Sequence, residues 1–199
     1  RVLVFELKDN EVIQSSKSNM LQSTALTSVE NLIQNGGFED QLNSANWTFG
    51  GSLPFQRSSE AHSGSYALQL GELSHNGQHY SQAYTTVSIP EDFPFPSLSF
   101  YYQVQSDDSI DLADLYVEVK DGVGLNHLIK IVHNGSEIED GQGVWKEAEI
   151  SLSRFRGETI RINFLARNRS STSTGILALI DDVQIISKPE NIYMPLIIR

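Results

Sequence analysis

The chain of 199 residues contains no cysteine and no excess of positive charge. Without cysteine it can form no disulfide, no thiolate metal site and no cysteine nucleophile, so packing or a bound ion must stabilise it. It has 14 lysines and arginines against 25 aspartates and glutamates, a formal net charge of −11. Because that charge repels phosphate backbones and anionic lipids, we predict no nucleic-acid partner.

Long hydrophobic runs are also missing. The longest apolar stretches, at residues 175–180 and 194–199, fall far short of the roughly 20 residues that span a bilayer. We therefore predict no membrane insertion. The chain begins at Arg1 rather than at methionine, and we expect a mature or trimmed fragment of a secreted or cell-surface protein.

The standard catalytic motifs do not occur either: the sequence has no HExxH, no GxSxG and no P-loop. His75 and His79 flank an Asn-Gly turn, which favours a solvated loop over a metal pair. Four aspartates within residues 107–114 are typical of an exposed loop, with a second cation site or a glycosidase carboxylate pair as alternatives. We predict that the protein is not an enzyme.

Short segments with alternating side chains fill the chain from Val29 onward. In residues 97–105, 114–120 and 158–166, apolar side chains occupy every second position, which places them on one face of a strand. Further strand candidates are residues 65–70, 79–87, 126–132, 144–152 and 176–186. About eight or nine such strands, separated by Gly, Asp, Asn, Ser and Pro, predict an all-β, antiparallel two-sheet β-sandwich.

We divide the chain into three parts. Residues 1–28 form an N-terminal arm or linker with a possible strand, because most of them are polar, serine-rich and weakly patterned. Residues 29–188 form the sandwich. Residues 189–199 are too apolar for a free linker, and we expect this tail to dock on the sandwich.

Several motifs together resemble a known family. They are NLIQNGGFED at 31–40, AHSGSYALQLG at 61–71, LSFYYQV at 98–104, a long stretch at 144–166 and LIDDVQI at 179–185. Their order and spacing are similar to those of the galactose-binding-like jelly rolls. That family includes the carbohydrate-binding modules of bacterial glycoside hydrolases and the MAM-like accessory domains of secreted bacterial peptidases.

The resemblance implies a jelly roll over about residues 31–186 and a noncatalytic carbohydrate-binding module of a secreted or cell-surface bacterial protein. The alternative is an accessory domain for protein interaction or adhesion without sugar affinity. The expected partner is therefore a glycan or polysaccharide, or else a protein.

The resemblance also implies a structural calcium ion where the first and last strands lie side by side. Its ligands would be Glu39, backbone carbonyls near Ser63 and Ser65, and Asp181. A calcium ion takes six to eight oxygen ligands, so carboxylates and carbonyls from distant segments suit it.

The strand pattern gives Asp181 a reading of its own. It shares parity with Leu179 and Val183, so a straight strand would point it into the core, where an unpaired carboxylate is costly. Calcium would compensate the charge; an arginine partner or a strand end near water would also do so. Asp182, of opposite parity, could simply be solvated.

A sugar-binding surface on a β-sandwich needs flat aromatic rings with polar groups beside them. The faces opposite the predicted core supply Tyr80, Gln82, Tyr84, Tyr101, Gln103, Tyr116 and Arg161. If their strands are neighbours, these residues form one tyrosine-rich polar face. The alternative is that tyrosine is there only because it favours half-buried strand surfaces.

The two tryptophans and several glycines have mainly structural interpretations. Trp145 precedes a strand and is predicted to pack in the core, while Trp47 is either structural or part of a loop site. The glycine pair at 36–37, Gly64 and Gly157 are expected at turns that need positive φ.

Overall fold

The computed structural model describes residues 31–42, 45–74, 77–106, 113–121, 126–134, 143–169 and 175–187. The N-terminal arm, the C-terminal tail, His75 and residues 107–112 lie outside this part of the chain. Within it, no helix is long and apolar enough to cross a membrane.

Strands dominate the described residues, and one short 3₁₀ helix, Ser153–Phe155, joins two of them. The strands are Thr48–Gly51 (β1), Phe55–Ser58 (β2), Ala67–Glu72 (β3), His79–Ser88 (β4), Pro96–Ser106 (β5), Ala113–Asp121 (β6), Asn126–Asn134 (β7), Lys146–Ser151 (β8), Thr159–Asn168 (β9) and Ile176–Ser187 (β10).

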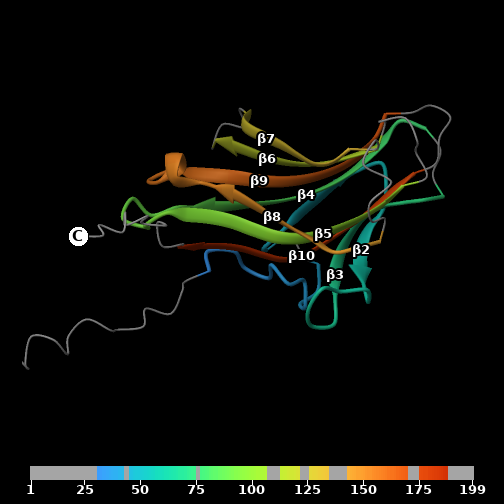
Figure 1. Ribbon diagram of the computed structural model, residues 1–199, viewed down its shortest axis with the longest axis horizontal. Coiled ribbons are helices and arrows are strands. Elements are labelled where there is room, and N and C mark those ends of the chain that lie inside the picture. Colours follow the sequence, from blue (N-terminus) through green and yellow to red (C-terminus); the bar gives the residue numbers. More distant parts are fainter. Residues whose placement is uncertain are drawn as a thin grey trace, which may run out of the picture. The chain divides into compact units, whose positions relative to one another are not determined.

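The strands form two antiparallel sheets that pack face to face (Figure 1). Sheet A has the order β1-β4-β9-β6-β7, and sheet B has the order β2-β3-β10-β5-β8. The predicted all-β, two-sheet sandwich is therefore confirmed. Most connections cross from one sheet to the other, so sequence neighbours such as β4 and β5 lie in different layers.

The core lies between the sheets and is built from the predicted alternation. Phe100 of β5, Val117 of β6 and Phe164 of β9 are each 0% exposed. Trp47 is also buried, packs against Phe38 and Phe164, and donates its Nε1–H to backbone carbonyls. Its role is structural, which settles the choice left open by the sequence.

The segment that begins at Asn31 runs beside the last strand, as expected. The amide of Leu32 donates to the carbonyl of Ile185 at 3.1 Å, and the amide of Val183 donates to the carbonyl of Gly36 at 3.0 Å. A Cβ on Gly36 would lie 1.9 Å from the Val183 carbonyl oxygen. Glycine is needed here for close approach.

The prediction of positive φ at this glycine pair is wrong, because Asn35 and Phe38 on either side of it take the left-handed conformation instead. The same prediction is confirmed at Gly64, with φ of 64°, and at Gly157, with φ of 77°. Both of these glycines lie in connections where a Cβ would also meet a carboxylate oxygen at 2.2 Å.

A β-bulge in β10 overturns the predicted orientation of Asp181. Pairing with β5 proceeds regularly to Asp181 opposite Tyr101, then shifts before Gln184, and Asp182 has a φ of 50°. The extra residue reverses the parity of the strand. Val183 therefore points into the core, whereas Asp181 points to the outer side of sheet B.

Candidate functional site

The seven predicted sugar-binding residues do not form one surface. Sheet A holds Tyr80, Gln82, Tyr84, Tyr116 and Arg161, but Tyr101 and Gln103 belong to β5 of sheet B. Alternation assigns a side chain to one face of its own strand and says nothing about which sheet that strand joins. The sequence prediction of a single tyrosine-rich face is wrong in this respect.

The outward side chains of β4, β9 and β6 form what we call the polar face. Strand β9 runs through its middle: Tyr80 and Tyr84 of β4 lie opposite Arg167 and Asn163, and Tyr116 of β6 lies opposite Leu165. The members of the polar face are Tyr80, Gln82, Tyr84, Thr86, Ser88, Asp114, Tyr116, Glu118, Lys120, Thr159, Arg161, Asn163, Leu165 and Arg167.

Arginines of β9 lie against tyrosines of both neighbouring strands. The guanidinium of Arg161 is 4.4 Å from the ring centroid of Tyr84, and that of Arg167 is 4.8 Å from the centroid of Tyr116. Cation–π contacts of this kind are attractive and favour positions of the rings beside the arginines.

A hydrogen-bond chain reinforces this arrangement. Arg167 Nη2 donates to the Tyr116 hydroxyl oxygen at 2.6 Å, and that hydroxyl donates to Asp114 Oδ2 at 2.9 Å. Burial, followed by the hydrogen bond to Asp114, raises the pKa of Tyr116 above its ordinary value. Both causes favour the neutral phenol, whose O–H is the donor to Asp114.

Hydrogen-bonding capacity remains unused along β9. Asn163 donates from Nδ2 to Glu118 Oε2 at 2.8 Å, yet its Oδ1 has no partner. The Nε atoms of Arg161 and Arg167 are likewise buried without a partner. Such groups are uncommon in folded proteins and call for a water, an ion or a ligand.

Sequence reasoning missed Arg167 and Asp114 as parts of this face. The predicted strand ended at Ala166, although Arg167 continues the alternation of Arg161 and Asn163 by one further step. Asp114 was assigned to a loop cluster, but it is 2% exposed within β6.

Two pockets border the tyrosines of β4. A pocket of about 440 Å³ lies at the end of the polar face, lined by Gln78, His79, Tyr80, Arg167, Asn168 and Arg169. A second, of about 260 Å³, lies on the side of β1 and includes Tyr84, Thr48 and Asn46 in its lining. The polar face therefore has a pocket beside it at two places.

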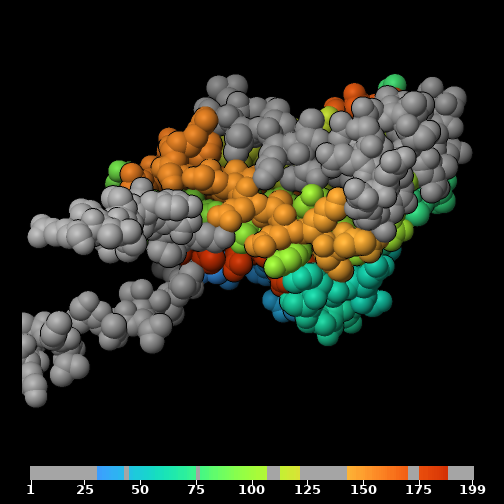
Figure 2. All heavy atoms as spheres, viewed as in Figure 1, coloured from blue at the N-terminus to red at the C-terminus, as the bar shows by residue number. Residues whose placement is uncertain are grey.

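The outer face of sheet B is occupied by the loop between β2 and β3, which belongs to the teal lobe at the lower right of Figure 2. His62 of this loop stacks on Tyr101, with centroids 3.5 Å apart and planes 11° apart. Gln103 is 1% exposed and donates from Nε2 to Glu60 of the same loop at 2.7 Å.

Trp145 corrects another prediction. It is partly exposed and contacts His62 edge-on at 5.7 Å, so it packs outside the core, on the outer side of sheet B. The prediction assumed that an aromatic residue at the start of a strand faces inward. Trp145 instead has the same parity as Glu147 and Glu149, whose neighbours Ala148 and Ile150 face the core.

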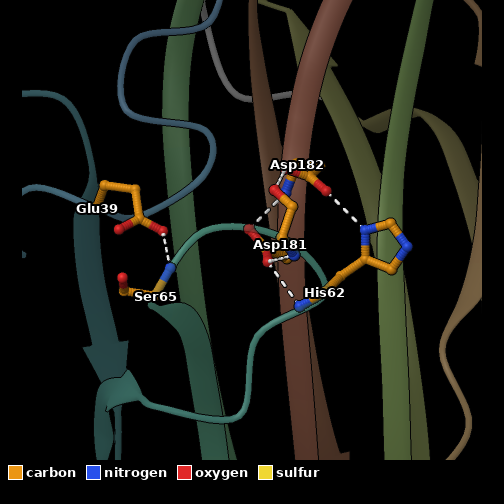
Figure 3. Close-up of polar contacts among 6 residues, drawn as sticks. Glu39, His62, Ser65, Asp181 and Asp182 are labelled. Carbon is orange, nitrogen blue, oxygen red and sulfur yellow. Dashed lines mark hydrogen bonds and ion pairs between the residues drawn. The ribbon is translucent and has the colours of Figure 1, made fainter.

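The two acids proposed as calcium ligands do converge on this loop (Figure 3). Asp181 Oδ2 accepts the amides of His62 and Ser63 at 2.9 and 3.1 Å. Glu39 Oε1 accepts the amides of Ser65 and Tyr66 at 2.8 and 3.1 Å. Segments around residues 39, 62–66 and 181 thus meet at one place.

Asp182 is also engaged, so the alternative that it is merely solvated is wrong. Its Oδ2 lies 2.7 Å from His62 Nδ1, and its Oδ1 accepts the hydroxyl of Ser63 at 2.6 Å. Asp182 has a positive φ, and its side chain points to the same loop that Asp181 binds. Because of the bulge, Asp181 and Asp182 both bind the loop between β2 and β3.

These residues fit a cation in part. In the described residues no three His, Cys, Asp or Glu side chains gather as a metal cluster, so Glu39 and Asp181 alone would not complete a calcium site. Ser63 and Ser65 present amides, rather than the predicted carbonyls, to the carboxylates.

Asp181 retains capacity for an ion. Its Oδ1 accepts a single amide, that of Asp182 at 2.7 Å, and a carboxylate oxygen can accept more than one donor. The side chain is 0% exposed, and burial raises the pKa of Asp181 above its ordinary value. A nearby positive charge would offset that desolvation.

No protein-family model and no curated protein matches the sequence. The structure does match solved structures. A family 61 carbohydrate-binding module in complex with β-1,4-galactotriose gives a TM-score of 0.57 at 20% identity, covering 80% of this chain and 99% of that one. The K3 cleaved adhesin domain of Lys-gingipain from Porphyromonas gingivalis W83 gives 0.52 at 18% identity, covering 80% and 98%.

A third match comes from a study of promiscuous specificity in carbohydrate-binding modules of the β-sandwich superfamily. Its TM-score is 0.51 at 11% identity; the match covers 80% of this chain but only 62% of that one, less than two thirds of its length. The similarity to MAM-like domains stays a prediction. The described residues share the two-sheet β-sandwich fold of these solved structures, two of which are carbohydrate-binding modules by name.

Proposed function

We propose that this protein is a noncatalytic carbohydrate-binding module of a secreted or cell-surface protein, and that its glycan lies along the polar face of sheet A. One observation is the main support. Strand β9 presents Arg161, Asn163 and Arg167, each with an unpartnered buried polar atom, between tyrosines on both neighbouring strands.

Sugars suit such a surface for a physical reason. A pyranose ring has an apolar face that packs on an aromatic ring and a rim of hydroxyls that need donors and acceptors. Tyr80 is 43% exposed and Tyr84 is partly exposed, so both rings can be reached. Arg161 lies next to Tyr84, is partly exposed and can supply polar contacts.

The compared structures suggest the first probe. The family 61 module was solved with β-1,4-galactotriose, a neutral galactan fragment. We would screen that oligosaccharide first and then a glycan array, using calorimetry to measure affinity for any ligand that binds.

The decisive experiment compares two tyrosines on opposite sheets. Tyr84→Ala and Arg161→Ala should each weaken glycan binding about tenfold or more, because each removes a contact at the centre of the face. Tyr101→Ala is the matched control, since it removes the same ring from sheet B and should leave affinity unchanged. Melting curves confirm that each variant is folded.

One result would contradict the choice of face, and another would contradict the function. Loss of binding in Tyr101→Ala alone would move the site to sheet B. Folded protein that binds no glycan on the array would favour the alternative, an accessory domain for adhesion or protein interaction, the class to which the compared gingipain domain belongs by name.

We also propose a structural calcium ion between Glu39 and Asp181, with the remaining oxygens from the backbone of the loop at residues 62–65. Three distant segments meet there, and Asp181 is a fully buried carboxylate. The ion would neutralise charge and tie the opening segment, the loop and β10 together without contacting the glycan. The main-chain amides are the competing explanation, and calcium-dependent melting distinguishes them.

A further inference from the structure

The pocket of about 440 Å³ at the end of the polar face has an unusual lining for this chain. The whole sequence has 25 acidic residues against 14 lysines and arginines. Among the described residues, the pocket is nevertheless lined by Arg167, Arg169 and His79, with Gln78, Asn168 and Tyr80, and by no acid. Every polar side chain in that set has N–H or O–H groups that can donate to an anion.

The two arginines are held from behind by one buried acid. Asp114, 2% exposed, lies 2.9 Å from Arg169 Nε and 3.5 Å from Arg167 Nη2. The side chains of Arg167 and Arg169 remain 38% and 44% exposed. An orienting carboxylate beneath a partly exposed guanidinium fixes its fork without removing it from the solvent.

Arg167 has N–H donors that no protein group in the described residues accepts. In the described part of the chain only its Nη2 makes polar contacts, to Asp114 and to the Tyr116 hydroxyl, and its buried Nε has no partner. A guanidinium has five N–H donors in a planar fork that matches the oxygens of a carboxylate or sulfate group. Lysine, a point charge, would not be equivalent here.

Tyr80 places an aromatic ring beside this cation. It lies directly opposite Arg167 in the β4–β9 pairing and is among the most exposed large side chains of the described residues. A sugar ring packed on Tyr80 would therefore direct one of its substituents towards the arginines.

We infer that this pocket binds an anionic substituent of a sugar, a carboxylate or a sulfate, so that the glycan on the polar face is an acidic one. The inference rests on the proposed function for the ligand being a sugar. The net charge of −11 does not oppose it, because charges further away than the Debye length of about 8 Å are largely screened at physiological salt, whereas the pocket contacts are direct.

The test uses sugars that differ at one carbon. Galactose, galacturonate and galactose 6-sulfate share a ring and differ in the group at C6, and glucose, glucuronate and glucose 6-sulfate form a second set. Binding is followed by the NMR signals of the arginine Nε–H groups and the backbone of β4 and β9. We expect at least one charged sugar to bind about tenfold or more tightly than its neutral counterpart, since charged hydrogen bonds are stronger.

Variants locate the effect. Arg167→Gln should abolish the preference for the charged sugar, whereas Arg156→Gln removes the same charge from an exposed position outside the polar face and should keep it. Raising the salt from about 50 to about 500 mM should weaken charged sugars selectively. The carboxylate and sulfate arms show which anion is preferred.

The inference is overturned if charged and neutral sugars of both sets bind equally or not at all, or if the preference survives Arg167→Gln. Its failure differs from failure of the proposed function. Neutral glycan binding that depends on Tyr84 but shows no charge preference would remove the anion site and leave the carbohydrate-binding module in place.

Discussion

The outer faces of both sheets carry tyrosines at alternating positions, but the surroundings of these tyrosines differ between the two sheets. On sheet A, Tyr84 and Tyr116 lie against arginines of their own sheet, and pockets border Tyr84 and Tyr80. On sheet B, Tyr101 is stacked under His62 of the protein's own loop. An outward tyrosine is therefore a candidate for ligand binding only where no segment of the same chain already covers it.

The polar groups of the two faces show the same contrast. On sheet B the acids Asp181 and Asp182 accept amides and a hydroxyl from the loop, so they hold a piece of the protein. On sheet A the atoms left without partners lie along β9. Sheet B also has two such atoms, Ser99 Oγ and Gln103 Oε1, but Gln103 is bound by Glu60 of the loop, whereas Arg167 of sheet A lines a pocket.

The largest effect should follow from detaching the loop of sheet B. Asp181→Ala leaves three amides without their acceptor, at a cost of about 3 kcal/mol, which for a chain of this size lowers the melting temperature by roughly 6–12 °C. Glycan affinity should not change if the functional face is on sheet A. Thermal unfolding and calorimetry test the two statements separately; an unchanged melting temperature would mean that the loop is held by other contacts.

Calcium removal should have the next largest effect. A chelator should lower the melting temperature by several degrees, because an ion present at 100 times its Kd stabilises the folded state by about 2.7 kcal/mol. Glu39→Gln should melt at the same temperature with and without chelator. If wild-type protein is insensitive to the chelator, the amides alone compensate the two acids, and the calcium proposal fails.

A third prediction compares the effects of removing Tyr101 and Tyr84 on stability and on glycan binding. Tyr101→Ala should lower stability by about 1 kcal/mol, the usual worth of an aromatic stack, and spare glycan binding. Tyr84→Ala should have the opposite profile. Urea unfolding and calorimetry on the same samples give both numbers, and a single variant that impairs both would blur the distinction between the faces.

The smallest effect concerns pH. Since the pKa of Tyr116 is raised above the ordinary 10.0 in the folded state, its contribution to stability is complete below pH 10.0 and is lost as the pH rises through the folded value. Wild-type protein should therefore lose stability more steeply than Tyr116→Phe in strongly alkaline solution. Urea unfolding across that range checks it, and parallel curves would refute the role of burial and Asp114.

Much of the fold follows from alternation alone. Eight strands were predicted within a few residues of their observed bounds, and the predicted inward positions, such as Leu98, Val117 and Ile162, are fully buried. Strands β1 and β2 were missed because each has four residues at a sheet edge, with glycines or exposed side chains in place of an apolar alternation. Short edge strands form when a neighbour supplies hydrogen bonds, and one sequence does not reveal the neighbour.

The candidate site was predictable only in its residue types. The polarity of the outer positions came from the alternating pattern, and the convergence of Glu39 and Asp181 on one loop came from the resemblance. Neither could show to which sheet Tyr101 belongs. The predicted orientation of Asp181 was wrong because one extra residue at Asp182 reverses the direction of every side chain after it, including Val183. Nothing in the letters of residues 179–185 distinguishes a straight strand from a bulged one.

The sequence by itself determined that this is an all-β chain with two sides to each strand, because side-chain polarity with a period of two is a local property of the backbone. Only the tertiary structure decided which tyrosines remain open, which acids bind the loop and which arginines share a pocket. Those outcomes depend on strand order, on crossings between sheets and on one bulge, and each is fixed by contacts between residues far apart in the chain.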